Sequence, residues 1–123
     1  MICLDTNYLI LGLIKGSDES HALIEWHHQG EALVAPMPAW YEFLCGPVNP
    51  AQVSTIRAFL VEIIPFGETQ SEKAAELFTL TGRNRRLKID GMIAATAICA
   101  NAALATNNRD DFKPFVKHGL KLI

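Results

Sequence analysis

The first residue that could take part in chemistry is an acid at the end of an apolar run. Asp5 directly follows MICL and is followed by two more polar residues, Thr6 and Asn7. A carboxylate at the end of a buried strand can cap the next helix, a contribution of about 1 kcal/mol. It can also project into a binding crevice. Both roles are open for Asp5, and neither excludes the other.

Three further acidic places stand out. Glu42 is the only charged residue between Leu33 and Val48, so its carboxylate must face solvent or meet a cation. Asp90 opens the small-residue helical run DGMIAATAICANA, where a helix cap is the simpler interpretation. Asp110 and Asp111 follow an apolar run within TNNRDDF, a segment that taken alone is typical of a polar turn.

These acids would repel one another if the fold brought them together. Two carboxylates about 6 Å apart, at an effective dielectric near 20, repel by roughly 3 kcal/mol. A cluster of this kind does not serve stability, but a divalent cation would relieve the repulsion. Because the candidate ligands are all carboxylate oxygens, they favour Mg²⁺ or Mn²⁺ over zinc.

Short apolar runs alternate with helical patterns along the chain. We expect strands at ICL (2–4), ALVA (32–35), VEIIPF (61–66), ALAT (103–106) and HGLKLI (118–123). We expect helices over 7–16, 20–30, 39–46, 50–60, 68–86 and 90–102. This alternation predicts a parallel sheet covered on both faces. In such sheets ligands bind at the carboxyl ends of the strands, where Asp5 would lie.

The length and composition of the chain limit the number of domains and the kinds of partner that we expect. A chain of 123 residues that is half apolar predicts one domain, residues 1–123. The net charge of −2 gives no general indication of a nucleic-acid or membrane partner. The three cysteines lie in apolar runs and predict buried thiols in a reducing compartment. No signal peptide or membrane span is evident, so we expect a cytoplasmic protein with no membrane partner.

Four ordered segments resemble those of a known family. LDTN, EFLCG, DGMIAATA and TNNRDDF are similar to the motifs of PIN domains, and most closely to VapC toxins of toxin–antitoxin pairs. The resemblance implies a three-layer α/β/α fold with a central, mostly parallel five-stranded sheet. It also implies a ribonuclease that depends on Mg²⁺ or Mn²⁺, a cognate antitoxin partner, an RNA substrate and a homodimer.

The resemblance also implies roles for individual residues. The metal-facing, catalytic acids would be Asp5, Glu42, Asp90 and Asp111, with Asp110 able to replace Asp111. Hydrogen-bonding supports would be Thr6, Asn7, Thr106 and Asn108. One departure concerns Glu42, because the Ser or Thr that many relatives place a few residues earlier is missing here. Hydrolysis by a metal-activated water would leave a 5′-phosphate and needs no 2′-hydroxyl nucleophile.

One basic run could bind RNA. GRNRRLK carries Arg83, Arg85, Arg86 and Lys88 just before Asp90. As a functional feature the run would clamp phosphates. Alternatively, it would be the solvated end of the preceding helix, with cations that complement the helix dipole.

Other functional classes fit less well. A housekeeping RNA-processing PIN nuclease and a catalytically silent PIN-like binding module remain alternatives. An aspartyl-nucleophile phosphatase usually has a second acid two residues after the first, where this chain has Asn7. A dinucleotide-binding protein is disfavoured because no G-x-G-x-x-G follows the first apolar run.

Overall fold

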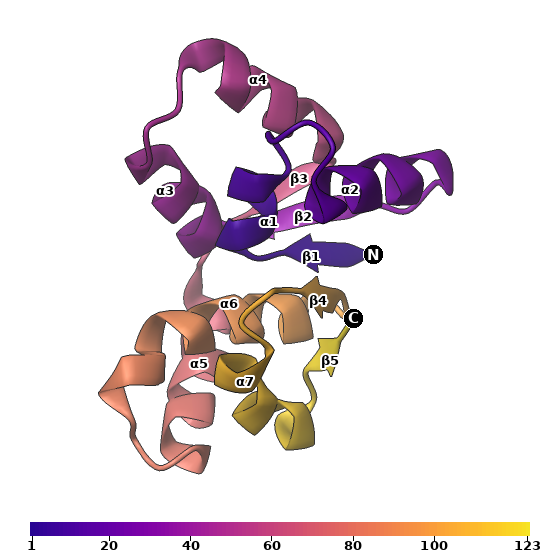
Figure 1. Ribbon diagram of the computed structural model, residues 1–123. Coiled ribbons are helices and arrows are strands. Elements are labelled where there is room, and N and C mark those ends of the chain that lie inside the picture. Colours follow the sequence, from indigo (N-terminus) through magenta and orange to yellow (C-terminus); the bar gives the residue numbers. More distant parts are fainter.

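A computed structural model describes residues 1–123 and places a five-stranded parallel sheet at the centre of the molecule (Figure 1). The strands are β1 (Ile2–Leu4), β2 (Leu33–Pro36), β3 (Glu62–Ile64), β4 (Ala103–Ala105) and β5 (Lys121–Leu122). Their order is β3-β2-β1-β4-β5, and every neighbouring pair is parallel. The predicted five-stranded sheet is confirmed, and it is entirely parallel.

Helices cover both sides of this sheet. They are α1 (Thr6–Leu11), α2 (Asp18–His28), α3 (Met37–Cys45), α4 (Pro50–Phe59), α5 (Glu68–Leu80), α6 (Lys88–Cys99) and α7 (Arg109–Phe112). Two 3₁₀ segments, η1 (Arg85–Leu87) and η2 (Lys113–His118), complete the list. Right-handed crossovers put α1 to α4 on one face and α5 to α7 on the other, and Figure 1 shows these two groups on opposite sides. The predicted three-layer α/β/α architecture is confirmed.

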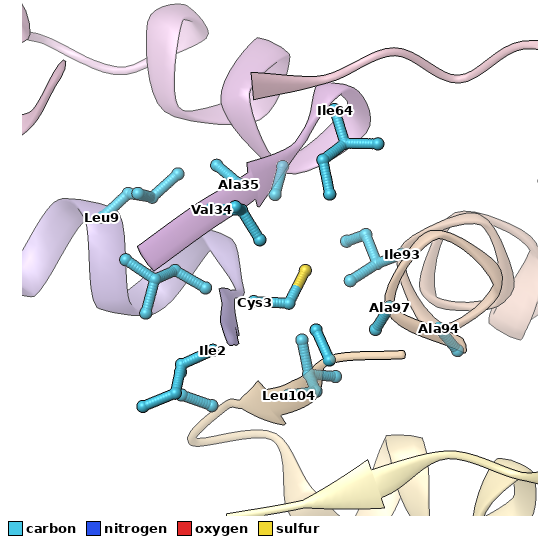
Figure 2. Packing of buried hydrophobic residues seen from close by; sticks show 14 of the residues in the cluster. Ile2, Cys3, Leu9, Val34, Ala35, Ile64, Ile93, Ala94, Ala97 and Leu104 are labelled. Atoms are coloured by element: carbon cyan, nitrogen blue, oxygen red, sulfur yellow. The ribbon is translucent and has the colours of Figure 1, made fainter. Parts of the chain in front are cut away.

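The core lies on both faces of the sheet, and one part of it lies between the central strand and α6. All three residues of β1 are buried, as a strand covered on both faces requires. Figure 2 shows Cys3 of β1 between Val34 of β2, Leu104 of β4 and the α6 residues Ile93 and Ala97. Small side chains on α6 allow that helix to lie close to the sheet. This packing fixes the start of α6 relative to the end of β1.

The first helix is shorter than predicted. α1 ends at Leu11, not at Gly16. At Gly12 an added Cβ would lie 2.6 Å from Leu23 Cδ1 and 2.7 Å from the Tyr8 carbonyl oxygen. The chain therefore passes too close to α2 for any side chain at this position, and it continues in tight turns.

The helix that precedes the basic run is also shorter than predicted. α5 ends at Leu80, whereas the sequence pattern extended it to Arg86. Gly82 (φ 86°) and Arg83 (φ 59°) adopt the left-handed conformation, which terminates a helix. The basic residues thus follow α5 in a loop, η1 and the first residue of α6, and none of them lies in the last turn of α5.

Asp90 is not a helix cap. α6 begins at Lys88, two residues earlier than expected, and its N-cap residue is Leu87, which makes no side-chain capping bond. Asp90 lies inside the first turn. Its carboxylate is therefore free for another role.

The three cysteines follow the predicted burial only in part. Cys3 is buried as predicted, but Cys45 and Cys99 are exposed, and each is the last residue of its helix.

No helix has both the length and the apolar character that a membrane crossing requires.

Candidate active site

The centre of the candidate site is the junction of β1 and α1. The backbone N–H of Asp5 donates to the Ala105 carbonyl at 3.0 Å, so the pairing of β1 with β4 extends to the acid itself. Only 4% of the Asp5 surface is exposed. A carboxylate this buried needs hydrogen-bond partners, and the surrounding polar residues supply them.

Three donors hold the Asp5 carboxylate. The Thr6 backbone N–H donates to Oδ1 at 2.8 Å, which makes Asp5 the N-cap of α1. Asn7 Nδ2 donates to Oδ2 at 3.2 Å, and Thr106 Oγ1 donates to the same oxygen at 2.7 Å. Asp5 therefore caps a helix and is also fixed in one orientation at the sheet edge.

Glu42 is tied to the same junction from α3. Thr6 Oγ1 donates to Glu42 Oε1 at 3.1 Å. Glu42 is exposed, so the lone charge in its apolar segment is solvated. Thr6 thus bridges two acids, with its backbone on Asp5 and its hydroxyl on Glu42.

The turn after β4 closes the other side of the site. Asn108 donates its backbone N–H to Thr106 Oγ1 at 3.0 Å, so this residue supports the site through its main chain. Asn107, which the sequence analysis did not single out, donates its backbone N–H to Asn7 Oδ1 at 3.1 Å. Its side chain donates to Glu19 Oε1 on α2 at 3.0 Å. The doubled asparagine in TNN was the only signal for this residue.

The pKa of the Asp90 carboxyl depends on the other charged groups of the site. Its pKa is raised to about 6, first by burial and then by the nearby charges of Asp5, Asp111 and Glu42, while Arg86 opposes them. The fold therefore brings the four predicted acids into one electrostatic neighbourhood.

The fourth acid of that neighbourhood is Asp111. Asp111 is partly buried and forms an ion pair with Arg86, at 2.9 Å between Nη1 and Oδ1. Asp110 is exposed and is not among the charges that shift Asp90. Of the two acids in this segment, the structure thus places Asp111 beside Asp90.

The four basic residues of the GRNRRLK run make separate contacts. Arg83 and Lys88 both lie over the Phe78 ring on α5, with their charged atoms 5.1 and 5.5 Å from its centroid. Arg86 reaches the acids through Asp111, and Arg85 is exposed. The structure brings one member of the run to the candidate site.

The donor set suits a hard divalent cation. Every acid that influences Asp90 offers carboxylate oxygens, which Mg²⁺ and Mn²⁺ prefer. In this arrangement no three Asp, Glu, His or Cys side chains converge closely enough to hold a metal ion. Glu42 is turned toward Thr6 and Asp111 toward Arg86, each through one oxygen. The residues fit such an ion in the chemistry of their donor atoms, and one carboxylate oxygen of Glu42 and one of Asp111 take no part in these contacts.

An apolar hollow of about 510 Å³ adjoins the acids. Its lining includes Met37, Tyr41 and Glu42 of α3, Phe66, and Ile89 and Met92 of α6. Glu42 belongs to both the hollow and the acidic group, so the two features share one border.

Comparison with known proteins identifies the family. The PIN domain family model matches residues 2–116, and the chain belongs to this family. The comparison with curated proteins gave no match.

Several solved structures share the fold. VapBC2 from Rickettsia felis, bound to a DNA fragment from its promoter, gives a TM-score of 0.78 at 23% identity, covering 100% of this chain and 98% of that one. FitAcB from Neisseria gonorrhoeae gives 0.72 at 20% identity, covering 100% and 96%. A toxin–antitoxin complex from Klebsiella pneumoniae gives 0.71 at 26% identity, covering 91% and 90%. The resemblance to PIN domains of the VapC type is confirmed.

Proposed function

We propose that this PIN-domain protein is a metal-dependent endoribonuclease, the toxin of a VapBC-type pair, which hydrolyses RNA phosphodiesters in the cytoplasm. One observation carries the proposal. Three carboxylates from separate parts of the chain, those of Asp5, Glu42 and Asp111, gather at the carboxyl edge of a PIN-type sheet around Asp90, whose pKa is raised to about 6.

The acids would hold Mg²⁺ or Mn²⁺. Asp5 is the fixed member, because Thr106 and Asn7 leave its carboxylate one orientation. Glu42, Asp90 and Asp111 would complete the ligand set. When bound, such an ion lowers the pKa of a water and stabilises the charge that develops on a phosphodiester. The residues of the chain orient the ligands, and Thr6 and Thr106 keep the carboxylates from turning away.

An antitoxin is the partner that we propose for this chain. The similar solved structures include complexes described by their names as toxin–antitoxin assemblies. The acidic site is open to solvent at Glu42, so a protein partner could cover it.

We also propose that the chain forms a homodimer through the apolar hollow beside Glu42. Met37, Tyr41 and Ile89 of its lining are exposed, and Tyr41 keeps 67% of its surface accessible. Contiguous exposed apolar side chains mark interaction surfaces. Light scattering on the purified chain should give twice the monomer mass, and Tyr41→Glu should shift the protein to monomer.

Cleavage of total cellular RNA by the purified protein, freed of any bound partner, tests the nuclease proposal. We expect discrete fragments with Mg²⁺ or Mn²⁺, none with EDTA, and none from Asp5→Asn. Sequencing the fragment ends would identify the cleaved bond. A folded wild type that cleaves no RNA and binds no metal would instead make the chain a silent PIN-like binding module.

A further inference from the structure

The members of the basic run make different contacts. Arg83 and Lys88 hold both ends of the loop against Phe78. Asn84 fixes the turn between them, because its side-chain oxygen accepts from the Arg86 backbone N–H at 3.1 Å and its carbonyl accepts from Leu87 at 3.0 Å. The backbone of Arg86 is therefore held in place on η1.

From this position the Arg86 side chain reaches α7. Its Nη1 lies 2.9 Å from Asp111 Oδ1. Arg109 carries the guanidinium closest in sequence to Asp111, and that group donates to the Ile123 carbonyl oxygen. Arg86 is thus the guanidinium that the fold directs to the carboxylate group.

Stability does not account for this ion pair. The Arg86 side chain is 66% exposed and that of Asp111 is 33% exposed. Pairs this accessible contribute about 0–1 kcal/mol. Nη1 supplies one contact, so most of the five N–H donors of the guanidinium remain available.

Those free donors lie where an RNA substrate needs a cation. A phosphate that approaches Asp5, Asp90 and Asp111 meets negative charge, and the chain as a whole has a net charge of −2. A guanidinium can bind a carboxylate on one edge and a phosphate on another, which a lysine ammonium cannot do in fixed geometry.

Building on the proposed nuclease function, we propose that Arg86 is a substrate-positioning residue, which holds Asp111 by one oxygen and binds a backbone phosphate of the RNA through its remaining N–H donors. Phosphate binding would require no movement of the loop, because Phe78 and Asn84 already fix it.

Binding of a fluorescent RNA oligonucleotide in EDTA tests this role without cleavage. We expect Arg86→Ala to weaken binding about tenfold, as loss of a charge-assisted hydrogen bond predicts. The dependence of affinity on salt should fall by about one phosphate contact. Arg85→Ala, which removes the same charge one residue away, is the matched control and should change both quantities much less.

A second variant separates phosphate binding from the ion pair. Asp111→Asn breaks the charge pair but removes a negative charge from the site, so RNA binding in EDTA should be unchanged or tighter. If Arg86 acted only through Asp111, Arg86→Ala would have no further effect in the Asp111→Asn background, whereas a direct phosphate contact predicts that the tenfold loss persists there. In cleavage assays Arg86→Lys should keep KM near the wild-type value and lower kcat, because it keeps the charge but not the bridging geometry.

The outcomes distinguish this inference from the function on which it rests. If wild type binds and cleaves RNA while Arg86→Ala binds as tightly as wild type, or no more weakly than Arg85→Ala, the role of Arg86 is refuted and the nuclease function stands. If wild type binds RNA in EDTA but never cleaves it, the nuclease function fails. A tenfold loss confined to Arg86→Ala would then still assign the phosphate contact to Arg86.

Discussion

Thr106 makes the shortest side-chain contact to Asp5, and both residues are buried. The hydroxyl donates to Asp5 and accepts from the Asn108 backbone N–H, so one small side chain satisfies groups on both sides of the site. Because Asp5 is 4% exposed, water cannot readily replace a lost donor. The network therefore contributes to stability as well as to the orientation of an acid.

Replacement of the Thr106 hydroxyl should destabilise the protein. Thr106→Val keeps the shape but leaves Asp5 Oδ2 without its 2.7 Å partner, at a cost of about 1–3 kcal/mol. Thr106→Ser keeps the hydroxyl and should lose less. Urea unfolding of both variants measures the difference, and equal losses would show that the methyl group, not the hydroxyl, matters.

Asp90 should make stability depend on pH in a definite direction. Its pKa is about 6 in the folded protein, well above the usual value of an aspartate carboxyl. Above pH 6 the folded state carries an unfavourable charge, and stability rises as the pH falls through 6 because the folded state takes up the proton first. Asp90→Asn, which is permanently neutral, should therefore melt higher than wild type at pH 7.5 in EDTA. Its advantage should shrink toward pH 4, and an advantage independent of pH would contradict this account.

At the scale of elements, close approach between segments decides where helices end. α1 stops where Gly12 lies against Leu23 and Tyr8, and α6 rests on the sheet through alanines. Both features depend on the absence of large side chains. The surroundings of a methyl group added at Gly12, after α1, differ from those of one added at Gly91, in α6.

Two glycine substitutions should have opposite signs. Gly12→Ala places a Cβ 2.6 Å from Leu23 Cδ1 and should cost about 1–3 kcal/mol. Gly91→Ala in α6 meets nothing closer than Phe115 at 3.8 Å and should stabilise by about 0.5–1 kcal/mol, through helix propensity. Thermal unfolding measures both, and destabilisation by Gly91→Ala would mean that α6 cannot accept a methyl group there.

Sequence patterns predicted elements well where a single physical signal dominated. The continuous apolar runs at 2–4 and 103–106 gave strands, as did the other three. Helix ends were less predictable: Arg83 in the left-handed conformation and the early start of α6 at Lys88 follow from tertiary packing that a local pattern does not contain.

The candidate site shows the same division. Asp5 and Asp90 could be found from their places beside strands and helices, whereas the contact from Asn107 to Glu19 joins residues 88 positions apart and has no local signature. The pairing of Arg86 with Asp111 spans 25 positions and was equally hidden.

At the scale of the whole molecule, the gathered acids oppose folding until their charge is balanced. A cation that binds the folded state alone stabilises it by mass action, about 2.7 kcal/mol at a hundredfold excess over Kd. Mg²⁺ or Mn²⁺ should therefore raise the melting temperature of wild type relative to EDTA.

Asp5→Asn is the control for that shift, since it removes one ligand and should reduce the increase. Equal increases in wild type and Asp5→Asn would show that the ions act elsewhere on the surface.

The pairing of β1 with β4 also sets the order of events during synthesis. Ile2 pairs with Ala103, and Asp5 receives its Thr106 hydrogen bond from 101 positions away. A growing chain emerges from its N-terminus at roughly 5–20 residues per second. For most of that time it contains Asp5 but neither β4 nor Thr106. The site can form only after β4 and Thr106 have been made, so an unfinished or prematurely terminated chain would lack the nuclease activity proposed above.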